Sequence, residues 1–438
     1  MDQKIRQLLR KRKEKLASRN NALSSYLPRM TQVFERIKGS QLRKIPPPFC
    51  VQFQVSQACS THCEMCTHYR ETLTRTQMPT KRVVELIEEM GSLGVRALVF
   101  SGGEPLMRRD LAILLRAAAR AKCRVGLLTS ATTEISLKSD DYDAIAEAVD
   151  WIAVSIDGVG DTDAVIRWAD RQERPRRADQ IRDFCSEVVK RSNALVEART
   201  RSAPIQLTAT VTLQQANINM DFQETCTEIQ KLGIGQVTFK LATGAKDTLE
   251  DKPKFLLTAG DLDSLVNRLH DESVTEDKRN NLDYLRRAFT SGLYDIASVA
   301  DGAPLHRYYQ SKRTRCFTVF TFALIEADGQ VYPCCHLYRD NHGADPRSRN
   351  LRKENILGDV SSKSFATVWN NKKYGELRKA LSKIDPASSK FLPCGECTRH
   401  CQHNMSLTEA FDLYQSNPEA YEEVVGDLPS QNDKPVWF

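Results

Sequence analysis

Apolar and polar residues alternate one by one along several short segments between residues 50 and 241. Val51, Phe53 and Val55 alternate with two glutamines and a serine, and apolar residues alternate with threonines through residues 207–213. A strict period of two predicts β-strands. Six strands are predicted in this region, at residues 50–56, 96–101, 124–129, 151–157, 206–213 and 236–241.

Helices are predicted between these strands, at residues 80–93, 110–121, 141–148, 176–197 and 220–232. Repeated strand–helix units indicate an α/β protein with a parallel sheet. A closed TIM barrel needs eight such units, whereas this region supplies six. We therefore expect a partial (β/α)6 TIM-like barrel.

The alternation also predicts what lines the inside of this barrel. Parallel strands that are buried on both faces are usually continuous apolar runs, but these strands have one apolar and one polar face. If helices cover the apolar faces, the polar faces line the interior. That inner face would carry Gln52, Gln54, Thr208, Thr210, Thr212, Thr238 and Lys240. The alternative is that some strands, chiefly the first, are exposed edges with an ordinary solvated face.

Further parts are expected on both sides of the barrel. Helices are predicted at residues 1–26, 260–270, 279–291 and 364–381, and Asp328-Gly329 predicts a turn between two short strands. The predicted order is a basic helical arm at residues 1–47, the barrel at 48–242, a helical bridge at 243–315, a small C-terminal α+β domain at 316–405 and a tail at 406–438.

Composition places the chain among ordinary globular proteins, with 41% hydrophobic and 27% charged residues in 438. No apolar run approaches the length of a membrane span, and no apolar segment follows the N-terminal charges. We therefore expect a cytoplasmic protein that does not interact with membranes.

The positive charge is concentrated at the N-terminus. Residues 1–47 contain 13 Lys and Arg against 3 Asp and Glu, whereas the net charge of the whole chain is +7. This distribution argues against a protein that coats nucleic acid and indicates one basic arm. The arm is either a solvated helix packed beside the barrel or a binding element for a phosphate or a partner.

Three cysteines directly after the first predicted strand are the strongest chemical signal. Cys59, Cys63 and Cys66 have three and then two residues between them. In a cytoplasmic chain with 13 cysteines, such spacing favours metal or cluster ligation over disulfides. Three thiolates on a four-iron cluster leave one iron without a protein ligand, as in metal sites that bind a substrate.

This spacing resembles the radical S-adenosylmethionine (radical SAM) superfamily. The resemblance implies that Cys59, Cys63 and Cys66 hold a [4Fe-4S] cluster and that S-adenosylmethionine occupies the open iron. It also implies cofactor-binding residues after the next strands. Gly102, Gly103 and Glu104 match the element that binds the cofactor's amino group, and Thr129, Ser155, Asp157 and Arg167 match later contacts to its carboxylate and ribose. Arg167 could instead be an ordinary surface arginine.

The match has two departures from the family pattern. Met65 stands where many relatives carry an aromatic residue, which puts adenine packing in doubt. Thr129-Ser130 replaces the frequent Thr-Asn-Gly after the third strand, which puts the ribose contact in doubt. Neither departure affects the cysteines.

A second set of cysteines lies in the C-terminal part and resembles the auxiliary-cluster domains called SPASM and twitch. The resemblance implies one auxiliary [4Fe-4S] cluster on Cys316, Cys334, Cys394 and Cys397, with Cys335 and Cys401 as possible substitutes. A structural zinc site is the alternative for this set. The remaining cysteines, Cys50, Cys123, Cys185 and Cys226, are expected to be small buried residues.

The expected function is therefore a radical SAM enzyme of oxidoreductase type. It would cleave S-adenosylmethionine reductively and abstract hydrogen from a small hydrophilic substrate such as a sugar, aminoglycoside or nucleoside, with oxidation or epimerisation as the outcome. A flavodoxin or ferredoxin would supply electrons. One alternative is a radical SAM enzyme that modifies a peptide or protein. Another is a non-catalytic iron–sulfur protein for electron transfer or assembly, which would not need Gly102, Gly103 and Glu104.

Overall fold

The computed structural model describes the chain from residue 23 to residue 426 with gaps. The larger gaps are residues 67–76, 168–176, 243–254, 291–314, 336–354 and 383–401. None of the described helices is long and apolar enough to cross a membrane.

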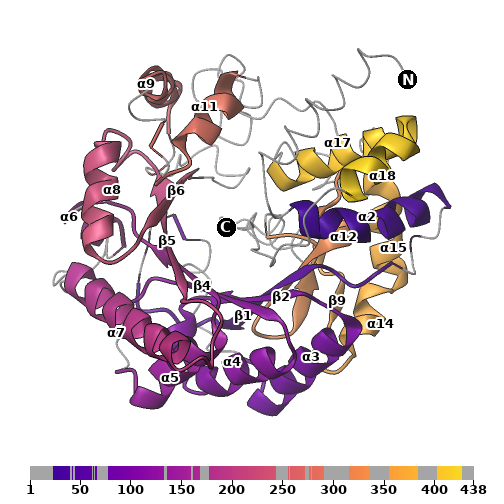
Figure 1. The fold of residues 1–438 in the computed structure, drawn as a ribbon, viewed down its shortest axis with the longest axis horizontal. Coiled ribbons are helices and arrows are strands. Elements are labelled where there is room, and N and C mark those ends of the chain that lie inside the picture. Colours follow the sequence, from indigo (N-terminus) through magenta and orange to yellow (C-terminus); the bar gives the residue numbers. More distant parts are fainter. Residues whose placement is uncertain are drawn as a thin grey trace, which may run out of the picture.

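One curved sheet of nine strands organises the described chain (Figure 1). Its spatial order is β6-β5-β4-β3-β2-β1-β7-β8-β9. The strands are β1 (Cys50–Ser56), β2 (Ala97–Gly102), β3 (Arg124–Thr129), β4 (Trp151–Ser155), β5 (Gln206–Leu213), β6 (Gln236–Leu241), β7 (Phe322–Ile325), β8 (Gln330–Tyr332) and β9 (Gly358–Asp359). The strands from β6 to β7 are parallel to their neighbours, whereas β8 and β9 join as antiparallel strands.

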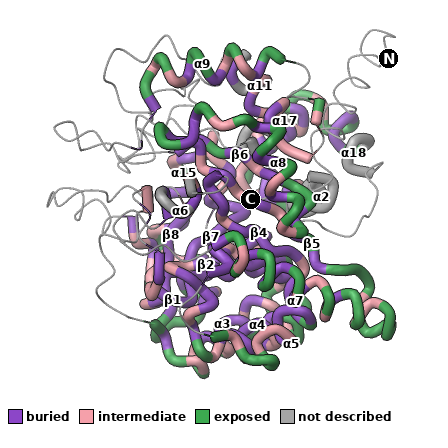
Figure 2. The backbone as a smooth tube through the Cα atoms, turned by 90° about the vertical axis from the view of Figure 1, so that its left-hand side faces the viewer, coloured by how far each residue is buried: buried purple, intermediate pink, exposed green. Residues whose placement is uncertain are grey.

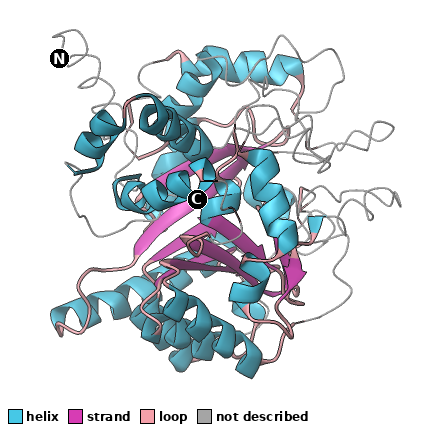
Figure 3. Cartoon of the chain, turned by 90° about the vertical axis from the view of Figure 1, so that its right-hand side faces the viewer, coloured by secondary structure: helices cyan, strands magenta, loops and turns pink. Residues whose placement is uncertain are grey.

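Helices cover the outer face of this sheet (Figure 3). Those between the first six strands are α3 (Thr80–Leu93), the 3-10 turn η1 (Pro105–Met107), α4 (Leu111–Arg120), α5 (Ser139–Ala148), α6 (Asp161–Arg167), α7 (Arg177–Glu197) and α8 (Phe222–Lys231). The others are α2 (Leu23–Lys38), α9 (Ala259–Leu269), α11 (Leu282–Thr290), α12 (Thr318–Thr321), α14 (Phe365–Trp369), α15 (Lys372–Leu381), α17 (Gln402–Ser416) and α18 (Pro418–Gly426).

The predicted α/β fold with six parallel strands is confirmed. One predicted helix is wrong in its continuity, because residues 364–381 form α14 and α15. Asn371 separates them, since its side chain accepts a hydrogen bond from the backbone N–H of Tyr374 and caps α15. The helix predicted at residues 1–26 lies mostly outside the described residues, and the described helix α2 runs from Leu23 to Lys38.

The polar faces of β5 and β6 point away from the outer helices. Phe239 packs edge-on against Phe222 of α8, with ring centroids 5.1 Å apart. The register pairs Thr210 with Thr238 and Thr212 with Lys240 on the opposite face of these strands. The threonines of β5 are half-buried, whereas the apolar residues between them are buried. Figure 2 shows that the strands of the sheet are mostly buried, whereas the outer helices carry most of the exposed residues. This inner face is therefore polar, as the alternation predicts.

The first strand is not an exposed edge, so that alternative is wrong for β1. It lies between β2 and β7 in the middle of the sheet. Gln52 and Gln54 are buried, and the Gln52 amide donates a 2.9 Å hydrogen bond to the Ser101 hydroxyl of β2. The partner strand comes from residues far along the chain, which the period of β1 cannot reveal.

A tryptophan of β4 packs closely against a glycine of the neighbouring strand β3. The indole of Trp151 lies across Gly126 of the neighbouring strand, where an added Cβ would stand 2.0 Å from the indole Cζ2. Glycine at this position is thus what allows Trp151 to be buried to 7% exposure.

We expect Gly126→Ala to destabilise the fold, because the new methyl group forces the buried indole to move. Overpacking of this kind typically costs about 1–3 kcal/mol. Chemical denaturation measures the change. The matched control is Gly235→Ala, since an added Cβ there meets no atom within 4 Å. Equal stability of the two variants would contradict this account of Gly126.

Aromatic residues join α2 to the last helices of the chain. The ring of Phe34 contacts those of Phe317, Phe411, Tyr414 and Tyr421, with centroid distances of 4.9–5.9 Å. Such contacts add to the burial of large apolar surfaces. The described part of the N-terminal arm is therefore packed against Phe317 and the helices α17 and α18. The predicted domain boundaries stay predictions.

Candidate functional site

The three cysteines of the first set lie on the loop that leaves the carboxyl end of β1. Cys63 is buried, and Cys59 and Cys66 are half-buried. A turn joins two of them, since the backbone N–H of Cys66 donates to the carbonyl of Cys63 at 2.9 Å. The Cys59 sulfur lies 3.1 Å from the Thr61 hydroxyl. One loop thus supplies three sulfur donors at the strand end where parallel α/β proteins place their sites.

Gly102 and Gly103 press the end of β2 against this loop. An added Cβ would stand 2.2 Å from the Ser56 carbonyl oxygen at Gly102 and 2.4 Å from the Ala58 carbonyl oxygen at Gly103. Gly102 also has φ of +142°, which disfavours other residues. The backbone N–H groups of Gly103 and Glu104 donate to Ser56 and Ala58 at 2.8 and 2.7 Å. The two glycines therefore set the position of the cysteine loop.

Glu104 is a buried carboxylate whose oxygens accept hydrogen bonds from the end of β3. It accepts from the Thr129 hydroxyl at 2.5 Å, from the Ser130 backbone N–H and hydroxyl at 2.7 Å each, and from the Leu106 N–H at 3.1 Å. Sequence reasoning placed Thr129 among the cofactor contacts. The structure places its hydroxyl on Glu104.

No described cationic side chain forms an ion pair with the Glu104 carboxylate. The buried arginines Arg108, Arg167 and Arg177 pair with aspartates instead. Burial accordingly raises the pKa of this carboxyl, although its hydrogen bonds act in the opposite direction. Burial and the nearby Glu104 charge also raise the pKa of the Cys59 thiol, to about 12. A cationic ligand beside Cys59 would balance this local negative charge.

Asp157 and Arg167 form a buried ion pair beside the cysteine loop. The Arg167 Nη2 lies 2.6 Å from Asp157 Oδ2, and its Nη1 lies 3.7 Å from the Cys63 sulfur. Asp157 Oδ1 accepts a 2.7 Å hydrogen bond from the backbone N–H of Thr212. Arg167 is therefore not a surface arginine. It links β4 and β5 to Cys63.

A buried arginine that sequence reasoning missed completes this region. Arg177 pairs with Asp163 at 2.5 Å and donates to the Ser155 carbonyl at 2.8 Å and to the Thr132 hydroxyl at 2.6 Å. Asp163 accepts from the backbone N–H of Asp157 at 2.6 Å. Arg177 thereby fixes the end of β4. Its position within an Arg-rich segment gave no signal that it is buried.

The predicted ligands for an iron–sulfur cluster fit the loop in their chemistry. Thiolates are the usual ligands of such clusters, and the loop holds three near the unbalanced Glu104. In the described part of the chain, no three His, Cys, Asp or Glu side chains are arranged to hold a metal ion. The three cysteines are close together in the sequence of the loop. To bind one cluster, their side chains would have to turn toward a common point.

The second cysteine set is described only in part. Cys316 and Cys334 are half-buried, as is Cys335. The backbone N–H of Cys316 donates to the Leu381 carbonyl at 2.9 Å, which ties this cysteine to the end of α15. Cys394, Cys397 and Cys401 lie outside the described residues. The ligand set of the auxiliary cluster therefore stays a prediction.

The four remaining cysteines, Cys50, Cys123, Cys185 and Cys226, are buried, as expected.

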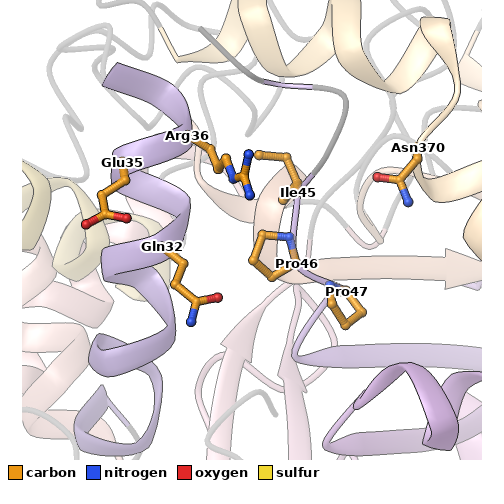
Figure 4. Close-up of a pocket in the computed structure, with 7 residues that line it drawn as sticks. All are labelled: Gln32, Glu35, Arg36, Ile45, Pro46, Pro47 and Asn370. Atoms are coloured by element: carbon orange, nitrogen blue, oxygen red, sulfur yellow. The ribbon is translucent and has the colours of Figure 1, made fainter. Parts of the chain in front are cut away.

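A cavity of about 700 Å³ lies elsewhere, between α2 and the proline segment that precedes β1 (Figure 4). Its lining residues are Gln32, Glu35, Arg36, Ile45, Pro46, Pro47 and Asn370. No predicted cluster or cofactor residue is among them, so we do not assign this cavity to the candidate site.

Comparison with family models gives two matches. The model described as "Radical SAM superfamily" matches residues 53–196. The SPASM model, described as an iron–sulfur cluster-binding domain, matches residues 316–402. The first match contains the cysteine loop, Glu104 and Arg167. The second contains the C-terminal cysteine set.

Relatives of known activity match only part of the chain. Pre-heme d1 synthase of Dinoroseobacter shibae is 33% identical over 147 residues, which are 33% of this chain and 35% of that protein. PqqA peptide cyclase of Xanthomonas campestris is 25% identical over 168 residues, 38% and 40% of the two chains. An S-adenosylmethionine-dependent nucleotide dehydratase of Lacinutrix mariniflava is 29% identical over 128 residues, which are 28% of this chain and 25% of that protein. The chain thus spans less than half the length of these relatives.

Solved structures share the fold. Streptococcus suis SuiB bound to its precursor peptide SuiA has a TM-score of 0.53 and 15% identity, covering 87% of this chain and 76% of that one. SuiB bound to S-adenosylmethionine has a TM-score of 0.52 and 15% identity, covering 87% and 78%. At these identities the likeness concerns the fold alone.

Proposed function

This chain belongs to the radical SAM superfamily and carries a SPASM domain, and we propose that it modifies a peptide or protein substrate by radical chemistry. The observation that carries the proposal is the pairing of these two domains in one chain together with its similarity to PqqA peptide cyclase. The family's cofactors are a [4Fe-4S] cluster with S-adenosylmethionine, and the SPASM domain implies an auxiliary iron–sulfur cluster.

Within this proposal, each part of the site has a role. Cys59, Cys63 and Cys66 hold the first cluster, and Glu104 binds the amino group of S-adenosylmethionine. When bound, cluster and cofactor together supply a 5′-deoxyadenosyl radical that abstracts hydrogen. The protein positions these groups through the glycine contacts to the loop and through Arg167 beside Cys63. A small electron-transfer protein such as flavodoxin or ferredoxin supplies the electron.

The inner face of the barrel suits a polar residue of the substrate. Thr208, Thr210 and Thr212 are half-buried there, and the Thr208 hydroxyl already donates to the Ile152 carbonyl at 3.3 Å. A peptide could place one polar side chain against the hydroxyls of Thr210 and Thr212 while the rest lies across the mouth of the barrel.

A hydrophilic small molecule is the second candidate substrate. The same threonine face favours it, because many hydroxyl groups in one place can pair with a sugar or a nucleoside. The similarity to a nucleotide dehydratase supports it as well. Oxidation or epimerisation of such a substrate would then be the reaction.

The two candidates are separated by release of 5′-deoxyadenosine from the reduced, reconstituted enzyme. We expect peptides to stimulate the release and one of them to change in mass, and we expect nucleosides and aminoglycosides to have no effect. The reverse result would establish the second candidate. The double variant Thr210→Val, Thr212→Val should slow substrate-dependent release and leave iron content unchanged.

We expect Glu104→Gln to weaken the binding of S-adenosylmethionine without loss of iron. The change removes a charge that would face the cofactor's ammonium, and a hydrogen bond to a charged group contributes about 1.5–3 kcal/mol. The dissociation constant should therefore rise about 10- to 150-fold. Equilibrium dialysis measures it.

The control for this variant is Thr129→Val, which removes one neutral donor to Glu104 and keeps the charge. Its effect on the dissociation constant should be much smaller. If Glu104→Gln binds the cofactor as tightly as the native protein, Glu104 does not contact the ammonium.

A further inference from the structure

A chain of hydrogen bonds joins Arg177 to Glu104 through two hydroxyl groups. The Arg177 Nη1 donates to the Thr132 hydroxyl at 2.6 Å, and that hydroxyl lies 3.0 Å from the hydroxyl of Ser130. The Ser130 hydroxyl donates to Glu104 Oε2 at 2.7 Å. All four residues are buried, with exposed fractions of 1–7%. The chain therefore runs through the interior of the protein.

The chemistry of the groups at its two ends gives this chain one direction. A guanidinium can only donate, so the Thr132 oxygen accepts from Arg177 and its own hydrogen points toward Ser130. An ionised carboxylate can only accept, so the Ser130 hydrogen points toward Glu104. The other acceptor near the Ser130 hydroxyl, the Thr132 carbonyl, is farther away at 3.1 Å. Bonds that point the same way strengthen one another, so Arg177 fixes the donor that Ser130 offers to Glu104.

Arg177 is itself held by two other contacts. Its Nε pairs with Asp163 at 2.5 Å, and its Nη2 donates to the Ser155 carbonyl at the end of β4 at 2.8 Å. Asp163 also accepts a 2.6 Å hydrogen bond from the backbone N–H of Asp157. The planar guanidinium thus connects the end of β4 with the turn after β3 in a fixed geometry.

The turn after β3 needs this support because its backbone is strained. Ala131 has φ of +52°, a region that disfavours residues with a side chain. The Ala131 N–H donates to the Thr129 hydroxyl at 2.9 Å, and this hydroxyl donates to Glu104 at 2.5 Å. Contacts on both sides of Ala131 therefore maintain the conformation that points two hydroxyls at the carboxylate.

We propose that Arg177 is a positioning residue for cofactor binding, which acts through Thr132 and Ser130 to hold the Glu104 carboxylate in the orientation that binds the amino group of S-adenosylmethionine. The inference rests on the role of Glu104 in the proposed function. A carboxylate that is already fixed loses less freedom when an ammonium binds to it, so the complex is tighter. Arg177 supplies this effect without contacting the cofactor.

Two substitutions of Thr132 test the chain, with equilibrium dialysis of S-adenosylmethionine against the reconstituted protein. Thr132→Val keeps the shape of the side chain and removes the hydroxyl. We expect it to raise the dissociation constant about 2- to 12-fold, the worth of one ordinary hydrogen bond, without loss of iron. Thr132→Ser keeps the hydroxyl and should bind the cofactor like the native protein. Equal weakening in both variants would overturn the inference, because packing and not the hydroxyl would then matter.

A double-mutant cycle tests whether Arg177 acts through Thr132. Arg177→Gln is combined with Asp163→Asn, so that no buried carboxylate is left without its cation. This variant should weaken cofactor binding at least as much as Thr132→Val does. Adding Thr132→Val to it should have no further effect, because the chain is already broken. Additive effects would show that Arg177 acts on binding by another route and would overturn the inference.

Thr225→Val is the matched control, since Thr225 is a buried threonine of the outer helix α8 whose hydroxyl donates to the Asp221 carbonyl at 2.6 Å. Its dissociation constant should equal that of the native protein. If Glu104→Gln weakens binding and Thr132→Val does not, the inference alone is overturned. If neither change weakens binding, the role of Glu104 in the proposed function is overturned with it. The Thr132 variants decide the matter even if the Arg177 variant does not fold.

Discussion

Replacement of Cys59, Cys63 and Cys66 by alanine is expected to abolish cleavage of S-adenosylmethionine. The three thiolates are the proposed ligands of the first cluster, and no thiolate elsewhere on the β1 loop can replace them. Anaerobically reconstituted native protein should hold about eight irons if it carries two four-iron clusters. The triple variant should hold about four irons and form no 5′-deoxyadenosine above background.

Three other cysteines provide the control for this experiment. Cys123, Cys185 and Cys226 are buried apart from both cysteine sets, and their replacement by alanine should leave iron content and cleavage near native values. Cleavage that persists in the variant of Cys59, Cys63 and Cys66 would refute the assignment of these residues. Loss of all iron in that variant would refute the separate auxiliary cluster.

Gly103→Val is expected to remove iron from the first site although it changes no ligand. An added Cβ at Gly103 would stand 2.4 Å from the Ala58 carbonyl oxygen and 2.6 Å from that of Gln57. Both contacts are with backbone, which cannot rotate away, so the loop that carries Cys59 must move. Iron content should fall from about eight toward about four, and cleavage should fall with it. Iron analysis and absorption spectra measure the loss.

Gly260→Ala is the control for the Gly103 variant. An added Cβ at Gly260 would meet only the Thr258 hydroxyl, at 3.9 Å. This control should retain both clusters and full cleavage. If Gly103→Val also retains its iron, the loop tolerates displacement, and the two glycines do not determine the position of the cluster.

The sequence was sufficient to predict the strands of the barrel because most of them, β1, β4, β5 and β6, alternate apolar and polar residues with a period of two. The segments β1, β3, β5 and β6 begin and end at the predicted residues. The apolar face of β6, for example, packs against the neighbouring helix α8 through Phe239 and Phe222. Local pattern and tertiary environment therefore agree, which is the condition under which such predictions succeed.

The partners of the site residues could not be predicted in the same way. The bonds from Thr129 and Ser130 to Glu104 join positions about 25 residues apart. The chain separation between Arg167 and Cys63 is about 100 residues. No periodic pattern encodes such pairings, because they depend on how the ends of different strands meet. The role of Gly102 and Gly103 could not be fully predicted either. The sequence suggested that they let a ligand approach the backbone, and the structure shows that they also let the cysteine loop approach it.

The central position of β1 has a consequence for how the chain folds. Its two neighbours are β2, which begins at Ala97, and β7, which begins at Phe322. During synthesis, one edge of β1 stays unpaired until more than two hundred further residues have been made, because its partner β7 begins only at Phe322. Such distant pairings form slowly, and an unpaired edge can join strands of other chains. A fragment that ends at residue 242 would keep that edge exposed, so we expect the barrel to aggregate when it is produced without residues 316–359.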